Sequence, residues 1–370
     1  MSVPLIDLGR QHKPLKAKIR EAFDRVLNNS SFILGEEVEK FEQHLAAYVG
    51  AKHAIGVTSG TDALLMALMA LDIGPGDEVI TTPFTFFSTA GCIARVGAKP
   101  VFIDINPRTY NLQWEQIEGA ITNNTKAIMP VHLFGQSAQM DQIMAIASRH
   151  NLRVIEDAAQ ALGARFGERM VGTIGDVGCY SFYPTKNLAA PGDAGALVTN
   201  DGELACRLKR IRAHGMDGVD HFSEIGGNFR LDAIKAAILS VKLPHLDSYA
   251  DARRAHADRY AQQLESLPIG TPFEAETRYH VYNQYTVRVH GGAREPLRHH
   301  LNACGIGNRI YYSRALHLQP CFEHLEQSQG SLPNAEDAAN EVLSLPVFPE
   351  LTHAEQQKVI DAIREFCRAE

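Results

Sequence analysis

Residues 152–160 read LRVIEDAAQ, and this stretch decides the fold class. The run Leu152–Ile155 is largely apolar, and the acidic pair Glu156 and Asp157 follows it directly. An apolar run of this length is typical of a strand that is covered on both faces, as in a parallel sheet. Such sheets bind ligands at the carboxyl ends of their strands. Asp157 is therefore predicted at a ligand-binding edge.

The same alternation of short apolar runs and longer helical patterns extends from about residue 54 to residue 200. Seven strands are expected there, at 54–58, 78–81, 100–103, 127–132, 152–155, 177–182 and 196–199. Helices are expected between them, for example at 61–71 and 140–150. This alternation predicts an α/β fold with a mostly parallel central sheet, flanked by helices and joined by right-handed crossovers.

Two domains are expected, because 370 residues are more than one hydrophobic core usually organises. A helical pattern at 231–243 ends before Pro244, and an Arg- and Ala-rich helix is expected at 251–267. We place a large domain at 1–245 and a smaller C-terminal α+β domain at 246–370. The smaller domain is expected to contain elements at 285–289, 295–304 and 335–366.

Composition and charge exclude several classes of function. A net charge of −7 argues against general affinity for nucleic acid or anionic membranes. No apolar run approaches the roughly 20 residues that span a bilayer, and the N-terminus lacks the pattern of a signal peptide. The six cysteines form no Cys-x-x-Cys pair, which indicates reduced thiols in a cytoplasmic protein. The sixteen histidines show no metal-ligand spacing, so no metal site is predicted.

Segment 58–63, with the sequence TSGTDA, follows the first predicted strand and opens a helix. Gly60 allows a tight turn, and Thr61 lies in the first helical turn. The first N–H groups of a helix have no intrahelical partner and readily bind phosphate. An ordinary helix cap is the more common explanation for such a segment taken alone.

Segment 156–160 places Asp157 directly after an apolar strand, with Gln160 three residues further on. A carboxylate at this edge of the sheet is suited to hold a cationic ligand group. Capping of the following helix explains an aspartate here equally well.

Segment 181–187, with the sequence SFYPTKN, also follows an apolar strand. Lys186 lies in a small polar loop, where burial can make an amine nucleophilic, and Ser181 adds a hydroxyl. Most lysines are solvated surface groups, so Lys186 alone decides little. Gly192 and Gly195 favour a closely approached backbone over a surface helix.

Segment 226–232, with the sequence GGNFRLD, combines a Gly-Gly bend with Asn228 and Arg230 just before a helix. Both side chains can donate to a phosphate or a carboxylate. A helix cap and a surface ion pair explain the same residues.

Taken together, these segments resemble the DegT/StrS family of pyridoxal-phosphate (PLP) aminotransferases, which act on nucleotide-linked sugars. The resemblance covers essentially the whole chain, from Ile6-Asp7-Leu8 to Leu345-Pro346, and is most specific from Ser181 to Asn187. It includes GTDAL at 60–64, GPGDEV at 74–79 and VHLFG at 131–135. The resemblance implies an aspartate-aminotransferase-like fold and PLP as the cofactor.

The resemblance also implies a role for each candidate residue. Lys186 would form the Schiff base with PLP and move protons during catalysis. Asp157 would pair with the pyridinium nitrogen, which keeps the ring an electron sink, and Gln160 would contact the phenolic oxygen. The residues implied to hold the phosphate are Gly60, Thr61 and Ser181.

Two further implications concern the surroundings of the cofactor. Phe86 aligns with the aromatic residue that stacks on the ring. Asn228 would reach the phosphate bound in the neighbouring subunit, so a homodimer with shared active sites is expected. The chain departs from the family pattern at 189–195, where AAPGDAG replaces the common GAYGDGG. The departure leaves Lys186 intact but affects the expected shape of this loop and any substrate contact made by the aromatic residue that is missing here.

Segment 309–322, with the sequence RIYYSRALHLQPCF, resembles the region that faces the sugar in this family. Together with Asn283-Gln284-Tyr285, its LHLQPCF part looks more like members that act on 3-keto sugars than on 4-keto sugars. Arg314 suits a diphosphate or a uronic acid, although a solvated surface arginine explains it equally well. The candidate substrate contacts are Arg230, Tyr312, Arg314 and His317.

The implied reaction moves an amino group, commonly from glutamate in this family, to the ketone of a nucleotide-linked sugar. A sugar dehydratase of the same fold would have His in place of Lys186. A non-catalytic regulator would need a damaged site, yet the candidate residues are intact. A dinucleotide-dependent dehydrogenase lacks its Gly-x-Gly-x-x-Gly turn after the first strand.

Overall fold

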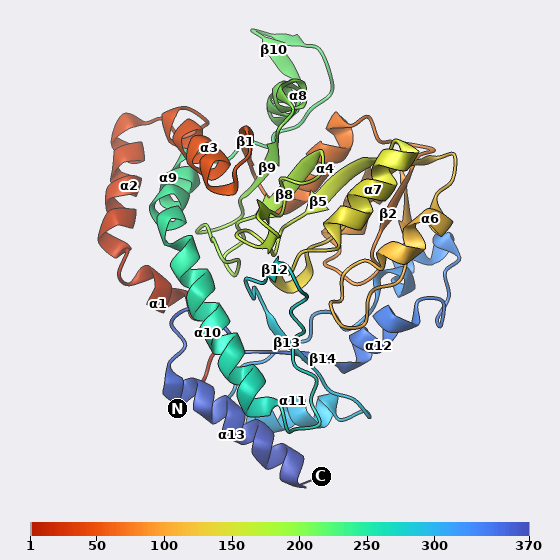
Figure 1. Cartoon of the computed structure of the whole chain (residues 1–370). Helices are drawn as coiled ribbons and strands as arrows, with labels where there is room; N and C mark the ends of the chain where they lie inside the picture. The colour runs from red at the N-terminus through yellow and green to blue at the C-terminus, as the bar shows by residue number, and fades with distance from the viewer. Residues whose placement is uncertain (1, 370) are drawn as a thin grey trace.

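A seven-stranded sheet forms the centre of the larger, upper part of the molecule in Figure 1. The computed structural model describes residues 2–369. The strand order is β1-β9-β8-β5-β4-β2-β3, and only β9 runs antiparallel to its neighbours. The prediction of an α/β fold with a mostly parallel sheet is therefore confirmed. The strands are β1 (His53–Val57), β2 (Glu78–Thr81), β3 (Lys99–Phe102), β4 (Thr125–Met129), β5 (Arg153–Asp157), β8 (Val177–Ser181) and β9 (Gly195–Thr199).

All seven expected strands occur in this sheet, and one of them ends three residues earlier than expected. The strand expected at 127–132 ends at Met129, because Pro130 has no N–H with which to continue the ladder. The pairing resumes at one position, where Val131 forms a parallel bridge with Asp157. The ends of β4 and β5 are thus fixed to each other next to the candidate site.

Helices cover the sheet on both faces, which explains the apolar runs in the strands. Successive side chains of a strand point to opposite faces. Ile155 packs with α4 (Gly60–Ala70), α5 (Ser88–Arg95) and α8 (Gly202–Arg212). Its neighbour Val154 packs with α7 (Met140–His150).

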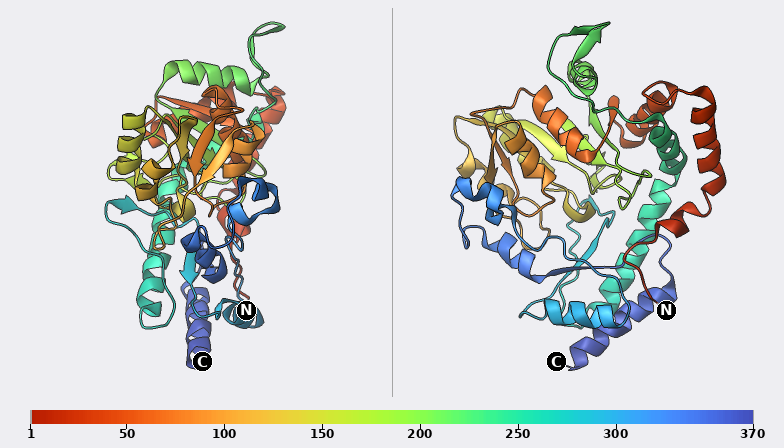
Figure 2. Two further views of the ribbon diagram at one scale, coloured as in Figure 1. Left: turned by 90° about the vertical axis from the view of Figure 1, so that its right-hand side faces the viewer. Right: turned by 180° about the vertical axis from the view of Figure 1, so that it is seen from behind.

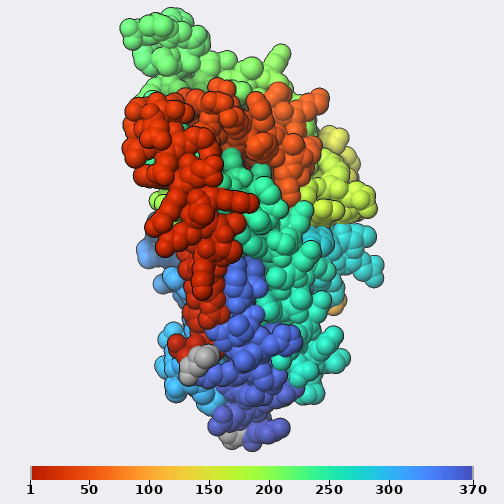
Figure 3. Space-filling model, turned by 90° about the vertical axis from the view of Figure 1, so that its left-hand side faces the viewer, coloured from red at the N-terminus to blue at the C-terminus, as the bar shows by residue number. Residues whose placement is uncertain are grey.

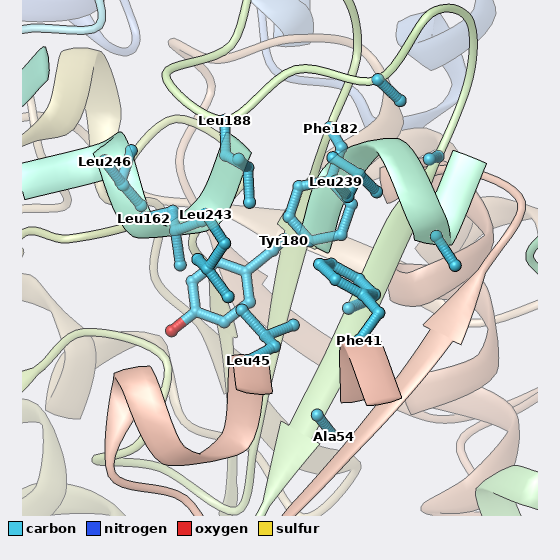
Figure 4. Close-up of a cluster of buried hydrophobic side chains, with 14 of the residues drawn as sticks. Phe41, Leu45, Ala54, Leu162, Tyr180, Phe182, Leu188, Leu239, Leu243 and Leu246 are labelled. Carbon is cyan, nitrogen blue, oxygen red and sulfur yellow. The ribbon is translucent and has the colours of Figure 1, made fainter. Parts of the chain in front are cut away.

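The face covered by α7 is extended by α3 (Glu36–Val49) and α9 (Ala233–Lys242). Figure 4 shows Phe41 and Leu45 of α3 packed against Tyr180 and Phe182. The rings of Phe41 and Phe182 meet edge to face, with 5.4 Å between their centroids. The strand that leads to the candidate lysine is therefore embedded in apolar side chains.

The C-terminal part is built around the antiparallel pair β13 (Tyr285–Arg288) and β14 (Val342–Leu345). The helix expected at 251–267 begins five residues earlier, as α10 (Leu246–Leu264), because it continues from a 3₁₀ turn that has Pro244 in its first turn. The other helices of this part are α11 (Arg294–Ala303), α12 (Pro333–Glu341) and α13 (His353–Ala369).

The N-terminal segment runs from the C-terminal part to the large sheet, along the face shown in Figure 3. Val3 forms a parallel bridge with Ile306, and Arg10 makes two hydrogen bonds with Glu355, of 2.7 and 2.6 Å. The helices of this N-terminal segment are α1 (Leu8–His12), which contains Arg10, and α2 (Lys16–Asn29). The division at residue 245 stays a prediction, since the first residues pack with the last third of the chain.

A hairpin of β10 (Met216–Gly218) and β11 (His221–Phe222) projects from the top of the molecule, whereas both termini lie at the opposite end (Figure 2). Within residues 2–369, no helix is long and apolar enough to cross a membrane. The remaining elements of regular structure are α6 (Ile117–Ala120), β6 (Arg165–Phe166), β7 (Arg169–Met170) and β12 (Arg278–Tyr279), together with short 3₁₀ turns.

A buried ion pair fixes the outermost strand β1. Glu42 and Arg212 are both 8% exposed, and Arg212 donates to the Glu42 carboxylate and to the Gly56 carbonyl. The same carboxylate accepts from the Gly56 N–H at 2.8 Å. Helices α3 and α8 are thus joined to the middle of β1 by one charged pair.

Replacing Arg212 by methionine should destabilise the protein by roughly 3–5 kcal/mol, because it leaves a buried carboxylate without its cation. The matched control is Arg25→Met, which breaks the exposed pair with Glu37 and should change stability by less than about 1 kcal/mol. Urea unfolding of both variants measures the difference. Equal losses would contradict the structural role assigned to Arg212.

Candidate functional site

Two glycines bring the end of β8 and the start of β9 against the start of α4, which follows β1. A Cβ added to Gly60 would lie 2.7 Å from the Cβ of Ser181. A Cβ added to Gly195 would lie 2.5 Å from the carbonyl carbon of Ser59. Because neither position has room for a side chain, the N-terminus of α4 lies directly on the ends of β8 and β9. The expected close approach of backbone at Gly195 is confirmed.

The start of α4 combines a helix cap with free donors. Ser59 is the N-cap residue, and its hydroxyl accepts from the Asp62 N–H at 3.0 Å. That cap leaves the N–H groups of Gly60 and Thr61 at the helix start, where intrahelical acceptors are absent. The Thr61 hydroxyl lies 2.7 Å from the hydroxyl of Ser88, on an exposed surface. The capping interpretation and the anion-binding interpretation are therefore compatible.

Asp157 is a buried carboxylate at the end of β5, with 4% of its surface exposed. Its carboxylate accepts from the Thr89 hydroxyl at 2.7 Å and from the Ala159 N–H at 3.2 Å. Burial raises the pKa of Asp157, although these hydrogen bonds oppose the rise. Thr89 was not predicted from the sequence, because it lies 68 residues away with no motif of its own.

The neighbouring Glu156 has a structural task on the other face of the strand. It is fully buried and pairs with His132 Nε2 at 2.9 Å, while His132 Nδ1 accepts from the Ala138 N–H. Burial alone would raise the pKa of Glu156, but these hydrogen bonds outweigh it and lower the pKa. The backbone N–H groups that donate to Glu156 belong to Gly172, Ile174 and Gly175.

Lys186 lies in the loop after β8 and is half-buried. Its backbone N–H donates to the Tyr183 carbonyl at 2.8 Å, and the adjacent Asn187 side chain donates to the Val281 carbonyl at 3.1 Å. Desolvation lowers the pKa of the Lys186 amine to about 8, and the nearby Asp157 carboxylate opposes this only in part. Asp157 and Lys186 are therefore a desolvated acid and amine that act on each other electrostatically.

Gln160 and Tyr312 meet across 152 residues of sequence. The Gln160 side chain donates to the Tyr312 hydroxyl at 3.0 Å and accepts from the Phe134 N–H at 2.8 Å. Burial raises the pKa of Tyr312, so its hydroxyl stays protonated at neutral pH. This contact places a predicted substrate residue directly beside a predicted cofactor residue.

The other predicted residues lie around this group with different degrees of exposure. Phe86 is 57% exposed, so its side chain is accessible to a ligand. Arg230 donates to the exposed side chain of Asn228 at 3.0 Å, and its backbone pairs with Val57 at the end of β1. Arg230 and Asn228 thus border the end of β1.

His317 and Arg314 are not brought into the group. His317 is 2% exposed, and its Nε2 lies 3.1 Å from the carboxylate of Glu336. Glu336 in turn accepts from the N–H groups of Gly330 and Leu332. Arg314 is exposed. The substrate roles of both residues stay predictions.

The sequence profile of one family matches most of the chain. The profile described as the DegT/DnrJ/EryC1/StrS aminotransferase family matches residues 13–364. The chain belongs to this family. The resemblance seen in the sequence motifs is therefore confirmed, and members of this aminotransferase family depend on PLP.

Relatives that match the chain over nearly its full length include the following three proteins. A pleiotropic regulatory protein of Geobacillus stearothermophilus is 52% identical, over 100% of this chain and 99% of that protein. The UDP-N-acetyl-3-dehydro-alpha-D-glucosamine 3-aminotransferase of Acidithiobacillus ferrooxidans is 45% identical, over 98% and 97%. The UDP-2-acetamido-2-deoxy-3-oxo-D-glucuronate aminotransferase of Pseudomonas aeruginosa is 44% identical, over 95% and 97%.

Solved structures of the family share the whole fold. Streptomyces venezuelae DesV, solved in complex with a ketimine intermediate, superposes with a TM-score of 0.96 at 43% identity, over 99% of this chain and 98% of that one. NtdA from Bacillus subtilis, solved with bound PMP, superposes with a TM-score of 0.93 at 32% identity, over 99% and 85%. This family member therefore has the fold of enzymes that carry a pyridoxal-type cofactor.

Covalent attachment of PLP to the cofactor-free protein should become faster as pH rises through about 8. Only a neutral amine attacks an aldehyde, and an amine with a pKa of about 8 is ~10% neutral at pH 7, far more than an ordinary lysine. Borohydride trapping at short times, followed by peptide mass analysis, measures the rate at Lys186.

The Asp157→Asn variant is the control for the sign of this effect. The Asp157 carboxylate raises the pKa of Lys186. Removing this carboxylate should therefore move the midpoint of the pH dependence of PLP attachment to lower pH. A wild-type midpoint near the ordinary lysine value would contradict the assigned desolvation.

Proposed function

We propose that this protein is a PLP-dependent aminotransferase that converts the 3-ketone of a nucleotide-linked sugar to an amine. The amino group comes from an amino acid, with glutamate as the donor expected for the family. The observation that carries the proposal is that Asp157, a buried carboxylate, acts electrostatically on Lys186, an amine whose pKa is lowered to about 8.

The residues present fit PLP in charge and in shape. The start of α4, with Gly60 and Thr61, offers backbone donors to a phosphate, and Ser181 adds a hydroxyl within contact of Gly60. The buried Asp157 carboxylate suits a pyridinium nitrogen, and the exposed ring of Phe86 suits a flat aromatic partner. We propose these residues, with Lys186 as the point of covalent attachment, as the PLP site.

Each residue then has a chemical task. When bound, PLP supplies an electron sink that stabilises the negative charge left after a carbon acid loses its proton. Asp157 would hold the ring nitrogen in its protonated form, because the ionised carboxylate would stabilise the positive charge there. Lys186, with a pKa near neutrality, can both accept and return a proton at the reacting carbon. Gln160 and Tyr312 are hydrogen-bonded to each other, and their polar side chains would orient the cofactor and the substrate.

The choice of a 3-ketone is supported by relatives and by sequence. The Acidithiobacillus and Pseudomonas proteins are both named for 3-oxo or 3-dehydro sugars. The Geobacillus relative is named as a regulator, but this chain retains Asp157, Gln160, Ser181 and Lys186. A purely regulatory protein would have no need for a desolvated lysine, so we favour catalysis.

We further propose a cytoplasmic homodimer with shared active sites. Asn228 is exposed and borders the strand ends, as expected of a side chain that serves a neighbouring subunit. The buried thiols Cys92 and Cys179 suit a reducing compartment. These proposals extend the family resemblance to the assembly and the location of the protein.

A panel of nucleotide-linked 3-keto and 4-keto sugars, with glutamate as donor, tests the proposed reaction. We expect kcat/KM for the 3-ketone to exceed that for the 4-ketone by at least about tenfold, the ratio for one well-placed contact. Lys186→Ala should abolish turnover and trapping of PLP by borohydride. A preference for the 4-ketone would reject the assigned regiochemistry, whereas turnover by Lys186→Ala would reject the catalytic lysine.

Mixing two inactive variants tests the shared site. Asn228→Ala and Lys186→Ala should each be impaired as pure proteins, because each lacks one part of every site. After subunit exchange, a mixed dimer would contain one site with both residues intact, so activity should return toward a quarter of the wild-type value. The control mixes Lys186→Ala with Asp157→Asn, which lie in the same subunit's site. Recovery in both mixtures, or in neither, would contradict the shared site.

A further inference from the structure

A second buried lysine lies behind the loop that carries Lys186. Lys242 is the last residue of α9 and is 0% exposed. Its amine donates to the carbonyl oxygen of Ala189 at 2.6 Å. Ala189 follows Lys186 by three residues and is itself 2% exposed. The contact therefore joins the helix to the candidate active-site loop from inside the protein.

Hydrogen bonds within the loop explain why Ala189 depends on an outside donor. The Ala190 N–H donates to the Phe182 carbonyl, and the Phe182 N–H donates to the Ala194 carbonyl, both at 2.8 Å. Pro191 has no N–H to offer. The Ala189 carbonyl is buried, and a buried carbonyl without a donor is costly. Lys242 supplies that donor.

Apolar packing holds α9 against the same loop. Figure 4 shows Leu188 and Phe182 in one cluster with Leu239 of α9 and Leu243 just beyond it. Ala190 and Ala194 belong to this cluster as well. Packing of this kind holds the loop near the helix, but it does not fix the direction of a single carbonyl group. The directional contact is the hydrogen bond from Lys242.

We propose that Lys242 is a positioning residue, whose hydrogen bond to Ala189 fixes the loop that presents Lys186. The inference rests on the proposed function, since it takes Lys186 to be the lysine that attaches PLP. It also gives a reason for the unusual AAPGDAG sequence at 189–195, because a loop with Pro191 has one backbone donor fewer. Lys242 acts through the backbone and has no contact with the reacting atoms.

The hydrogen bond from Lys242 to Ala189 does not depend on whether the Lys242 amine is charged or neutral. His12 Nε2 lies 3.4 Å from the amine, and the half-buried Glu350 attracts it. The fully buried Arg253 lies close enough to Glu350 to lower the pKa of the Glu350 carboxyl, against the rise that burial causes. Burial lowers the pKa of Lys242 to about 8, yet a neutral amine still has N–H groups to donate. The bond to Ala189 can therefore persist on both sides of that pH.

Lys242→Met and Lys242→Gln form a matched pair for the test. The two side chains have similar length, and only glutamine retains N–H donors. Lys235→Met is the control on the same helix, because Lys235 pairs with Asp232 at 2.8 Å, makes no hydrogen bond to the loop, and keeps through methionine an unbranched side chain near Gly192. All variants are made in the full chain.

Hydrogen–deuterium exchange is the first measurement, since it needs no cofactor. Lys242→Met should accelerate exchange of residues 182–194 on the order of tenfold, as expected for one lost buried hydrogen bond, and leave residues 53–70 unchanged. Lys242→Gln should show a smaller increase, and Lys235→Met none. Wild-type exchange in Lys242→Met, or equal acceleration of both segments, would overturn the proposal. A glutamine variant as affected as the methionine variant would overturn the hydrogen bond as the cause.

The pH midpoint for covalent attachment of PLP is the second measurement. A loosened loop exposes Lys186 to water, so Lys242→Met should raise the midpoint above about 8, with the adduct still on Lys186. Loss of packing elsewhere would lower stability without moving this midpoint. An unchanged midpoint would overturn the positioning role. Absence of any adduct in the wild type would instead reject the proposed function, and the exchange data would still decide whether Lys242 holds the loop.

Discussion

A carboxylate and an amine that are both withdrawn from water form the constraint on which the site depends. Burial raises the pKa of Asp157 and lowers that of Lys186, so it favours the neutral form of each. In the proposed PLP site, a cationic ring nitrogen would favour the ionised form of the Asp157 carboxylate. The same burial leaves Lys186 available as a nucleophile. One environment therefore prepares two groups for opposite tasks.

The position of Asp157 is secured by its neighbour in sequence. Side chains at 156 and 157 point to opposite faces of β5. The two acids therefore lie at the same strand end but contact different groups. Glu156 ties residues 172–175 and His132 to the strand, whereas Asp157 meets Thr89 of α5. The strand end is thus held from one face while it offers a carboxylate on the other. Rigid support of this kind keeps a binding group in one orientation.

Local patterns predicted the fold well, because apolar periodicity and strand–helix alternation are properties of short segments. They also placed Asp157, Ser181 and Lys186 at strand ends, since position in a parallel sheet follows from the strand that precedes a residue. They could not predict Thr89 beside Asp157 or Tyr312 beside Gln160, pairs that lie 68 and 152 residues apart. Contacts of that separation depend on how whole elements pack.

The two lysines with lowered pKa values, Lys186 and Lys242, differ in whether their amines are hydrogen-bonded. Lys186 and Lys242 are both desolvated, and the pKa of each is lowered to about 8. Within residues 2–369, no acceptor bonds the Lys186 amine, whereas the Lys242 amine is held by Ala189. An amine without a partner can turn toward a ligand, and an amine bonded to a carbonyl is fixed. The loop between residues 186 and 189 therefore joins the lysine that we propose to be reactive to one that is anchored, and in our proposal the anchored lysine limits where the reactive one can act.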